Sequence, residues 1–243
     1  MINYELVEIC QKLRLQNLAN LSKTNQLGNE QHIEWLINLL KQEVEVKRNK
    51  KIARLYQQAR FPKRKTLDDY IWHEQINFST ENSKQELLDL EFIKNNENAV
   101  FVGTPGTGKT HLATAIGIKA IEKGLNVKFW RVAELVDLLE KEWTRQSIEQ
   151  FKRKCHKYQL IILDEMGYVP FSKTGSELLF QLISDWYENK SIIITSNLEF
   201  SQWSKVFIDP RLTAALVDRL IHHAHIISFT GESYRLKNAL SNN

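Results

Sequence analysis

A glycine-rich loop between an apolar run and a helical segment constrains the fold of this chain most strongly. The run 99–102 before the loop predicts a buried strand, and apolar residues at helical spacing over 111–122 predict a helix. The loop itself fits the phosphate-binding pattern of a glycine, four residues of any kind and then Gly-Lys-Ser/Thr. Its residues are Gly103, Thr104, Pro105, Gly106, Thr107, Gly108, Lys109 and Thr110.

The order of strand, loop and helix gives this pattern its chemical meaning. Backbone N–H groups at the start of a helix surround anionic phosphate, and glycines allow the backbone to approach closely. We expect Lys109 to reach the β- and γ-phosphates and the hydroxyl of Thr110 to hold Mg²⁺. A glycine turn that merely begins a helix does not explain a lysine and a threonine directly after Gly108.

A second apolar run, 160–163, ends in two carboxylates, Asp164 and Glu165. In phosphate-loop NTPases the aspartate after such a strand supports the Mg²⁺, which is the role expected for Asp164. Glu165 then suits a base that orients or deprotonates an attacking water. A strand that ends in two solvated acids is the plainer interpretation, but it is disfavoured once the loop is considered.

Two further positions leave alternatives open. Asn197 follows the apolar run 192–194, and its amide either lies near the γ-phosphate or caps the strand in a turn. Arg211 and Arg219 lie on a helix that begins near Asp209. Either arginine could complete the site of a neighbouring subunit, or form a surface ion pair instead.

The wider pattern predicts a doubly wound α/β domain with a five-stranded parallel sheet flanked by helices. Its strand-like runs are nearly continuous in apolar residues, as in strands buried on both faces. They lie at 99–102, 126–130, 159–163, 191–195 and 225–229. We expect residues 1–62 to form a small, basic, all-helical domain for DNA or partner binding and assembly, with a break near Gly28. Pro62 is expected to mark the boundary to the ATPase domain at 63–243.

Composition indicates where in the cell the protein is expected to act. The chain has 243 residues, a net charge of +4 and no apolar run long enough to span a membrane. No signal peptide is recognisable at the N-terminus. Cys10 and Cys155 form no CxxC motif, which favours a reducing, cytoplasmic location.

Two basic clusters predict contact with nucleic acid through its phosphates, although a solvated charged surface is the alternative for each. The first consists of Lys47, Arg48, Lys50, Lys51, Arg54, Lys63, Arg64 and Lys65. The second consists of Lys141, Arg145, Lys152 and Arg153, near Trp143. No base-reading module is recognisable, so we expect recognition of backbone or shape.

Several blocks resemble one family of ATPases. Besides the loop, they include the run from Asp164 to Pro170, the run from Glu177 to Ile183, and Thr195-Ser196-Asn197-Leu198. Further blocks are Phe200-Ser201-Gln202-Trp203, Asp218 to His225 and Gly231 to Arg235. Together they look like a AAA+ ATPase of the initiator and helicase-loader branch, and within it the chain resembles the IstB-like ATP-binding proteins, helpers of insertion-sequence transposases.

The resemblance implies an ATP- and Mg²⁺-dependent homo-oligomer that binds double-stranded target DNA and recruits the cognate transposase. It also implies that His111 belongs to the nucleotide site and that Asn197 senses the γ-phosphate. Arg219 becomes the arginine finger for the adjacent protomer, with Arg211 as second choice. Only residues 230–243 follow the last expected strand, which is short for the usual AAA+ lid, so a neighbour is expected to close the site. Arg235 is a weak substitute for the arginine of that lid.

The sequence also raises two other functions and one other site. A replicative helicase loader of the DnaC type shares the ATPase core and differs in its partner. A small-molecule kinase is disfavoured by Glu165 and Asn197. His222, His223 and His225 raise the idea of a metal site, but no carboxylate or cysteine ligand lies at supporting spacing, so we expect none there.

Overall fold

The computed structural model describes residues 4–23, 29–78, 80 and 83–234. Gly28 and Arg235 therefore lie outside the described residues. The chain divides into two compact units, Met1–Arg54 and Leu55–Asn243, and one helix passes from the first into the second. The functional boundary expected at residue 62 stays a prediction. Among the described helices, none combines the length and the apolar character needed to cross a membrane.

The first unit is helical, as predicted. It contains α1 (Tyr4–Leu13), α2 (Gln16–Lys23) and the first part of α3 (Glu30–Ala59). Arg14, in the left-handed region with φ 61°, ends α1 and separates it from α2, a break that the sequence pattern did not predict. The core of this unit is made by Leu6, Ile9, Cys10, Leu13, Ala19, Ile37 and Leu40.

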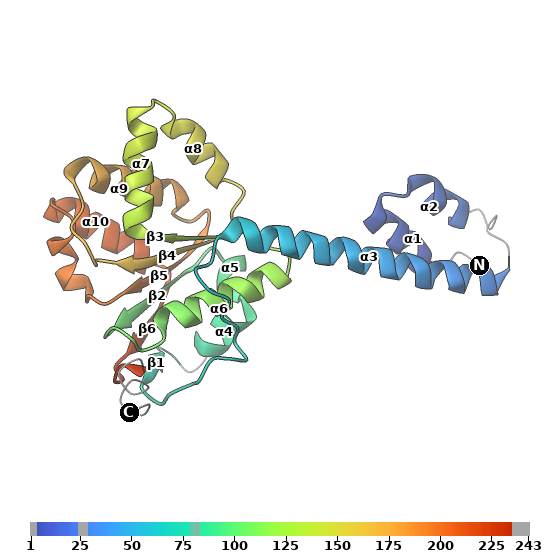
Figure 1. The fold of residues 1–243 in the computed structure, drawn as a ribbon, viewed down its shortest axis with the longest axis horizontal. Coiled ribbons are helices and arrows are strands. Elements are labelled where there is room, and N and C mark those ends of the chain that lie inside the picture. The colour runs from blue at the N-terminus through green and yellow to red at the C-terminus, as the bar shows by residue number, and fades with distance from the viewer. Residues whose placement is uncertain (1–3, 24–28, 79, 81–82, 235–243) are drawn as a thin grey trace. The chain divides into compact units, whose positions relative to one another are not determined.

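The second unit is built on a sheet whose described strands follow the order β1-β6-β2-β5-β4-β3 (Figure 1). These strands are β1 (Ile76–Phe78), β2 (Asn98–Gly103), β3 (Val127–Arg131), β4 (Leu160–Met166), β5 (Ser191–Ser196) and β6 (Ala224–Phe229). The five predicted parallel strands are present. The sixth, β1, pairs antiparallel with β6 at the sheet edge and was missed, because three residues are too few to show a pattern.

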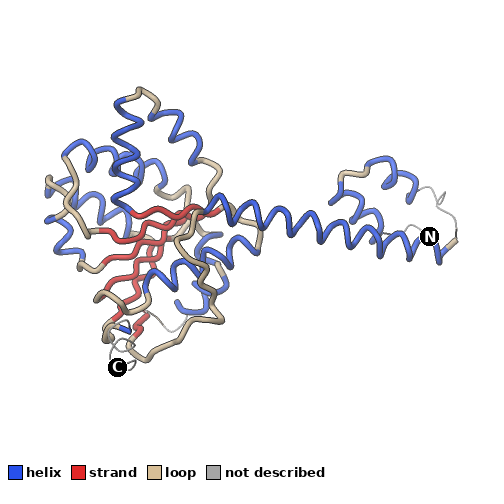
Figure 2. Tube along the Cα trace, viewed as in Figure 1, coloured by secondary structure: helices blue, strands red, loops and turns tan. Residues whose placement is uncertain are grey.

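Helices cover both faces of this sheet, as Figure 2 shows. They are α4 (Ser83–Asp89), α5 (Glu91–Lys94), α6 (Lys109–Glu122), α7 (Val132–Thr144), α8 (Ile148–Cys155), α9 (Lys173–Trp186), α10 (Pro210–Ile221) and the 3₁₀ turn η1 (Phe200–Lys205). In Figure 1, α7, α9 and α10 lie on one face and α6 on the other. Along β4, Ile161 and Leu163 enter the core beneath α7, α9 and α10, whereas Ile162 approaches Gly117 of α6. Burial on both faces explains why these strands read as continuous apolar runs.

Candidate nucleotide-binding site

The glycine loop connects β2 to α6 and needs glycine for its backbone path. Gly106 and Gly108 adopt φ of 83° and 98°, and Gly108 is the N-cap of α6. Gly103 has φ 147°, and a Cβ there would collide with the carbonyl oxygen of Phe229 on β6. The glycines of the sequence pattern are therefore required by left-handed backbone and by close packing against β6.

Lys109 lies almost fully buried on the loop itself. Its exposed fraction is 8%, and Nζ donates hydrogen bonds to the carbonyl oxygens of Gly103 at 2.7 Å and Thr104 at 2.6 Å. The Thr107 hydroxyl donates to the same Thr104 carbonyl at 2.8 Å. Phosphate oxygens can replace these carbonyls as acceptors, because a charged donor bonds most strongly to a charged acceptor.

Asp164, at the end of β4, is 2% exposed and accepts two hydrogen bonds. The Thr110 hydroxyl donates to its Oδ1 at 2.7 Å, and the Thr195 hydroxyl donates to the same atom at 2.6 Å. These bonds compensate for the burial of the carboxylate. A hydroxyl and a carboxylate are oxygen ligands of the kind that Mg²⁺ prefers, so the two residues fit the metal expected from the sequence.

Glu165 directly follows the buried Asp164, but the backbone is irregular at this point of β4. The pairing of β4 with β5 shifts register between Leu163 and Met166, and Glu165 has φ 61°. Its N–H donates to the Thr195 hydroxyl at 3.0 Å. Its side chain is 51% exposed and lies 3.7 Å from Nε of Arg131. A left-handed non-glycine residue held in a bulge is typical of functional positions, where local structure re-aims a side chain.

Thr195 and Arg131 are thus site residues that sequence reasoning missed. The polar ending of the run at Thr195-Ser196-Asn197 is visible in the sequence, but the pattern predicts a role for Asn197 alone. Asn197 is exposed and directly follows β5, the strand between β2 and β4. Its amide therefore lies at the same edge of the sheet as the loop and the two acids, although its role stays a prediction.

Arg219 lies at the opposite end of the parallel strands from the glycine loop. Its neighbour Leu220 accepts a hydrogen bond from the side chain of Asn98, at the start of β2, whereas the glycine loop follows the end of that strand. Six residues of strand span about 20 Å, so Arg219 cannot serve the loop of its own chain. Its guanidinium donates to the Ser184 hydroxyl and lies 4.7 Å from the ring centroid of Phe180, both on α9.

Arg211 lies at the other end of α10. It is exposed, and its N–H donates to Oδ1 of Asp209, the N-cap of the helix, at 2.8 Å. The two arginines that the sequence left as alternatives therefore lie at opposite ends of one helix.

A pocket beside the loop was not predicted. It is lined by His73, Gln75, Ile76, Thr107, Phe229, Gly231, Glu232 and Tyr234. The segment after β6 contacts the loop directly: the Thr104 hydroxyl donates to the Gly231 carbonyl, and the N–H of Tyr234 donates to the Gly106 carbonyl, both at 3.0 Å. The rings of His73 and Tyr234 lie next to the phosphate loop, with their centroids 6.2 Å apart and their planes tilted by 45°.

His111, predicted to belong to the nucleotide site, faces the segment that precedes β1. Its Nε2 lies 3.2 Å from the Thr66 carbonyl, and its ring meets that of Tyr70 edge-on at 5.0 Å. Burial lowers the pKa of His111, which favours the neutral ring. The structure thus gives His111 contacts with Thr66 and Tyr70, and a contact with nucleotide stays a prediction.

The two basic clusters are exposed to different degrees. On α3, Lys47 and Arg48 pair with Glu43 and Glu45, whereas the described part of the chain gives Lys50, Lys51 and Arg54 no salt bridge. Lys63, Arg64 and Lys65 are exposed in the loop after α3.

In the second cluster, Lys152 is held by Asp185 at 3.0 Å and Glu149 at 3.7 Å, and its side chain is only 18% exposed. Arg153 donates to a backbone carbonyl of its own helix. Lys141 and Arg145 remain exposed at the end of α7, beside Trp143, which is 55% exposed.

The strand order and the loop between β2 and α6 define a P-loop nucleotide-binding protein of the AAA+ class. The fold is similar to the DnaC helicase loader, with a TM-score of 0.56 and 21% identity over 72% of this chain and 98% of that chain. It is also similar to AMPPCP-bound DnaA from Aquifex aeolicus, with a TM-score of 0.57 and 20% identity over 75% of this chain and 56% of that one. At such identities the likeness concerns the fold alone.

Within this class, the chain belongs to the family of IstB-like ATP-binding proteins, which matches residues 9–242. It is 36% identical to the ATP-binding protein of insertion sequence IS232 from Bacillus thuringiensis subsp. berliner, over 98% of this chain and 94% of the relative. It is also 36% identical to the corresponding protein of IS5376 from Geobacillus stearothermophilus, over 95% and 93% of the two chains. The family resemblance inferred from the sequence is thereby confirmed.

Proposed function

We propose that this protein hydrolyses ATP at a site completed by a second copy of the chain, and that it uses ATP to assemble on target DNA and stimulate an insertion-sequence transposase. One observation carries the hydrolysis: the Thr195 hydroxyl contacts both the Asp164 carboxylate and the backbone of Glu165. The metal-binding acid and the water-activating acid are thereby held in one fixed relation.

In the proposed mechanism each group has a separate task. Backbone N–H groups of the loop and Lys109 bind the phosphates. Thr110 and Asp164 would hold Mg²⁺, which would neutralise charge on the phosphate oxygens. The half-exposed carboxylate of Glu165 orients the attacking water and accepts its proton, and the Asn197 amide positions that water or the γ-phosphate.

Two variants test hydrolysis. Lys109→Ala should lose ATP binding, as measured with a fluorescent analogue. Glu165→Gln should bind ATP normally but hydrolyse it about 10²–10⁴-fold more slowly, the usual contribution of a general base. Lys119→Ala, on the same helix but away from the loop, is the matched control. Normal turnover by Glu165→Gln would remove the glutamate from the proposed role.

DNA binding is proposed from the exposed cations of α3 and of the loop after it, which offer phosphate contacts without base readout. Affinity for duplex DNA should fall steeply between 50 and 200 mM salt, by about 10³-fold if some six phosphates are contacted. Lys50→Glu with Lys51→Glu should weaken binding, whereas Lys94→Glu, which lies in an ion pair on α5, should not. A flat salt response would contradict this proposal.

The transposase partner is proposed from the insertion-sequence relatives. The test adds the protein, ATP and Mg²⁺ to a strand-transfer reaction with the transposase encoded beside it. We expect stimulation by the wild type and none by Lys109→Ala. A helicase loader is the second candidate, favoured by the likeness to the DnaC helicase loader, which is covered over 98% of its length. Stable capture of a ring helicase without stimulation of strand transfer would favour that alternative.

A further inference from the structure

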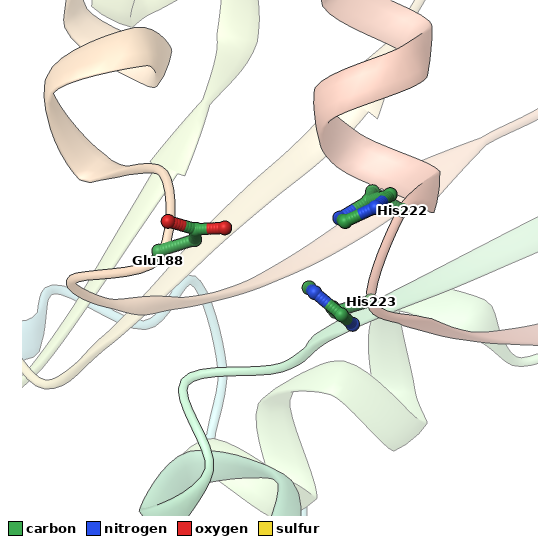
Figure 3. Close-up of side chains that lie close together, drawn as sticks. All are labelled: Glu188, His222 and His223. Carbon is green, nitrogen blue, oxygen red and sulfur yellow. The ribbon is translucent and has the colours of Figure 1, made fainter.

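Three potential metal ligands converge at the edge of the sheet opposite the glycine loop. Figure 3 shows Glu188, from the turn after α9, close to His222 and His223, from the turn after α10. All three residues are exposed, and one ligand atom from each lies within 4.8 Å of the others. The carboxylate that the sequence pattern did not supply thus comes from a turn more than thirty residues earlier in the chain.

The two turns are anchored to the sheet and to each other. The N–H of Asn98, at the start of β2, donates to the His223 carbonyl at 2.7 Å, and its side-chain oxygen accepts from Ile192 of β5. The Tyr187 hydroxyl lies 2.9 Å from Nδ1 of His222. Such a contact orients a ligand imidazole: in the tautomer whose Nδ1–H donates to Tyr187, Nε2 holds the lone pair.

We propose that Glu188, His222 and His223 bind a divalent cation of the zinc class, with water completing the coordination. Two imidazoles and one carboxylate form a donor set that suits Zn²⁺. Ligand atoms around tetrahedral zinc lie about 3.3 Å apart. The three groups, whose ligand atoms lie within 4.8 Å of one another, therefore need to close by at most about 1.5 Å, which exposed side chains achieve by small rotations.

The surroundings favour a cation at this position. His222 is the C-cap of α10, and the C-terminal end of a helix attracts positive charge. The turn that carries Glu188 is also constrained, because this residue adopts φ 58°, in the left-handed region. His225 is not part of the group, because its ring contacts Glu97 at 2.9 Å and Glu86 at 3.8 Å instead.

A metal here would join the C-terminal ends of α9 and α10. These helices pack on each other, and the Arg219 side chain lies between them on Phe180 and Ser184. Metal binding would thus stabilise the helix pair that carries the proposed finger. The metal site itself does not depend on ATP hydrolysis, so the two proposals can fail separately.

The test uses the full chain without an affinity tag, stripped with a chelator and dialysed against Zn²⁺ alone. We expect about one bound zinc per chain, and four-coordinate visible absorption when Co²⁺ replaces it. Glu188→Gln and His223→Ala should each lose most of the bound metal. His156→Ala, an exposed histidine outside the group, is the matched control and should retain it.

A second measurement guards against variants that misfold. Saturating Zn²⁺ should raise the melting temperature of the wild type by about 2–4 °C, because the ion binds the folded state alone. Glu188→Gln, which keeps the size of an exposed side chain, should fold normally and show no rise. Failure of the wild type to bind zinc, or equal binding and equal stabilisation in Glu188→Gln, would overturn the proposal.

Discussion

At the scale of single residues, hydroxyl groups organise the candidate site as much as the acids do. The Thr110 and Thr195 hydroxyls both donate to one oxygen of Asp164, and Thr195 also accepts from the backbone of Glu165. Two donors on one oxygen of a buried carboxylate fix its orientation. The threonine at the end of β5 therefore holds both acids of the neighbouring strand β4.

Replacement of Thr195 by the isosteric valine tests this role. It leaves Asp164 with one fewer donor and the N–H of Glu165 without its acceptor. We expect a loss of about 1.5–3 kcal/mol in the free energy of unfolding, typical of a hydrogen bond to a charged group, and slower ATP turnover. Thr195→Ser keeps the hydroxyl and is the control. Equal stability and turnover in Thr195→Val and the wild type would contradict the interpretation.

Lys128, on β3, makes stability depend on pH. The side chain is 7% exposed and donates to the Gln58 carbonyl at 3.1 Å. Its pKa is lowered from 10.5 to about 8, first by burial and then by Arg60 and Lys157. Between these two values the unfolded chain holds a proton that the folded chain has released, so stability rises with pH in this window and the penalty is fully present below about pH 8.

The comparison with Lys128→Met isolates this effect. From pH 7 to pH 10, the free energy of unfolding of the wild type should gain about 2 kcal/mol relative to the variant. Denaturant unfolding at a series of pH values measures the difference. Parallel curves for the two proteins would show that Lys128 titrates normally in the folded state.

Some residues of the site can be recognised from the sequence around them, and others cannot. Gly103 to Thr110 are recognisable because one short loop needs all of them together, and Asp164 because it ends a buried strand. Arg131, His73 and Tyr234 carry no such signal. They meet the site only through the sheet order and through the crossing of residues 231–234 over the loop.

At the scale of elements, α10 carries both candidate arginines, Arg211 near its start and Arg219 near its end. Its N-cap, Asp209, accepts from the N–H groups of Arg211 at 2.8 Å and Leu212 at 3.3 Å, and Pro210 follows at the first helical position. Proline there costs no hydrogen bond, and the cap satisfies two donors that the helix leaves open. The start of α10 was therefore readable from Asp-Pro alone.

Asp209→Ala should destabilise the protein by about 1 kcal/mol, with a fall of about 2–4 °C in melting temperature. Asp209→Asn keeps an acceptor and should lose much less. Calorimetry compares the three proteins. If Ala and Asn at this position behave alike, charge rather than capping stabilises the helix start.

Helices and strands were likewise predicted where the sequence shows a clear pattern and missed where it shows none. Five strands were visible because each is apolar and is buried on both faces, and the long helices because their apolar residues recur at helical spacing. The strand β1 and the break at Arg14 had no such pattern. The first exists because the edge of β6 offers hydrogen-bonding partners, and the second because one residue adopts a left-handed backbone.

At the scale of the whole molecule, the glycine loop and Arg219 lie at opposite ends of the parallel strands. The loop and both acids lie at the carboxyl ends of the parallel strands, and Arg219 lies beside the start of β2. A single chain cannot bring these edges together, because the sheet itself separates them. Head-to-tail contact between copies would place the arginine edge of one against the loop edge of the next.

Mixing two inactive variants tests this arrangement. Arg219→Ala and Glu165→Gln should each bind ATP and hydrolyse it poorly, yet their mixture on DNA should recover part of the wild-type rate, because some interfaces combine an intact loop edge with an intact arginine. A mixture of Lys109→Ala and Glu165→Gln is the control: both changes lie at the loop end of the strands, so every site contains one inactivating substitution and no activity should return.

Absence of recovery in the first mixture, with recovery when Arg211→Ala replaces Arg219→Ala, would transfer the role to the arginine at the start of α10. Full activity of isolated Arg219→Ala chains would instead place hydrolysis within one copy, against the separation of the two edges by the length of β2.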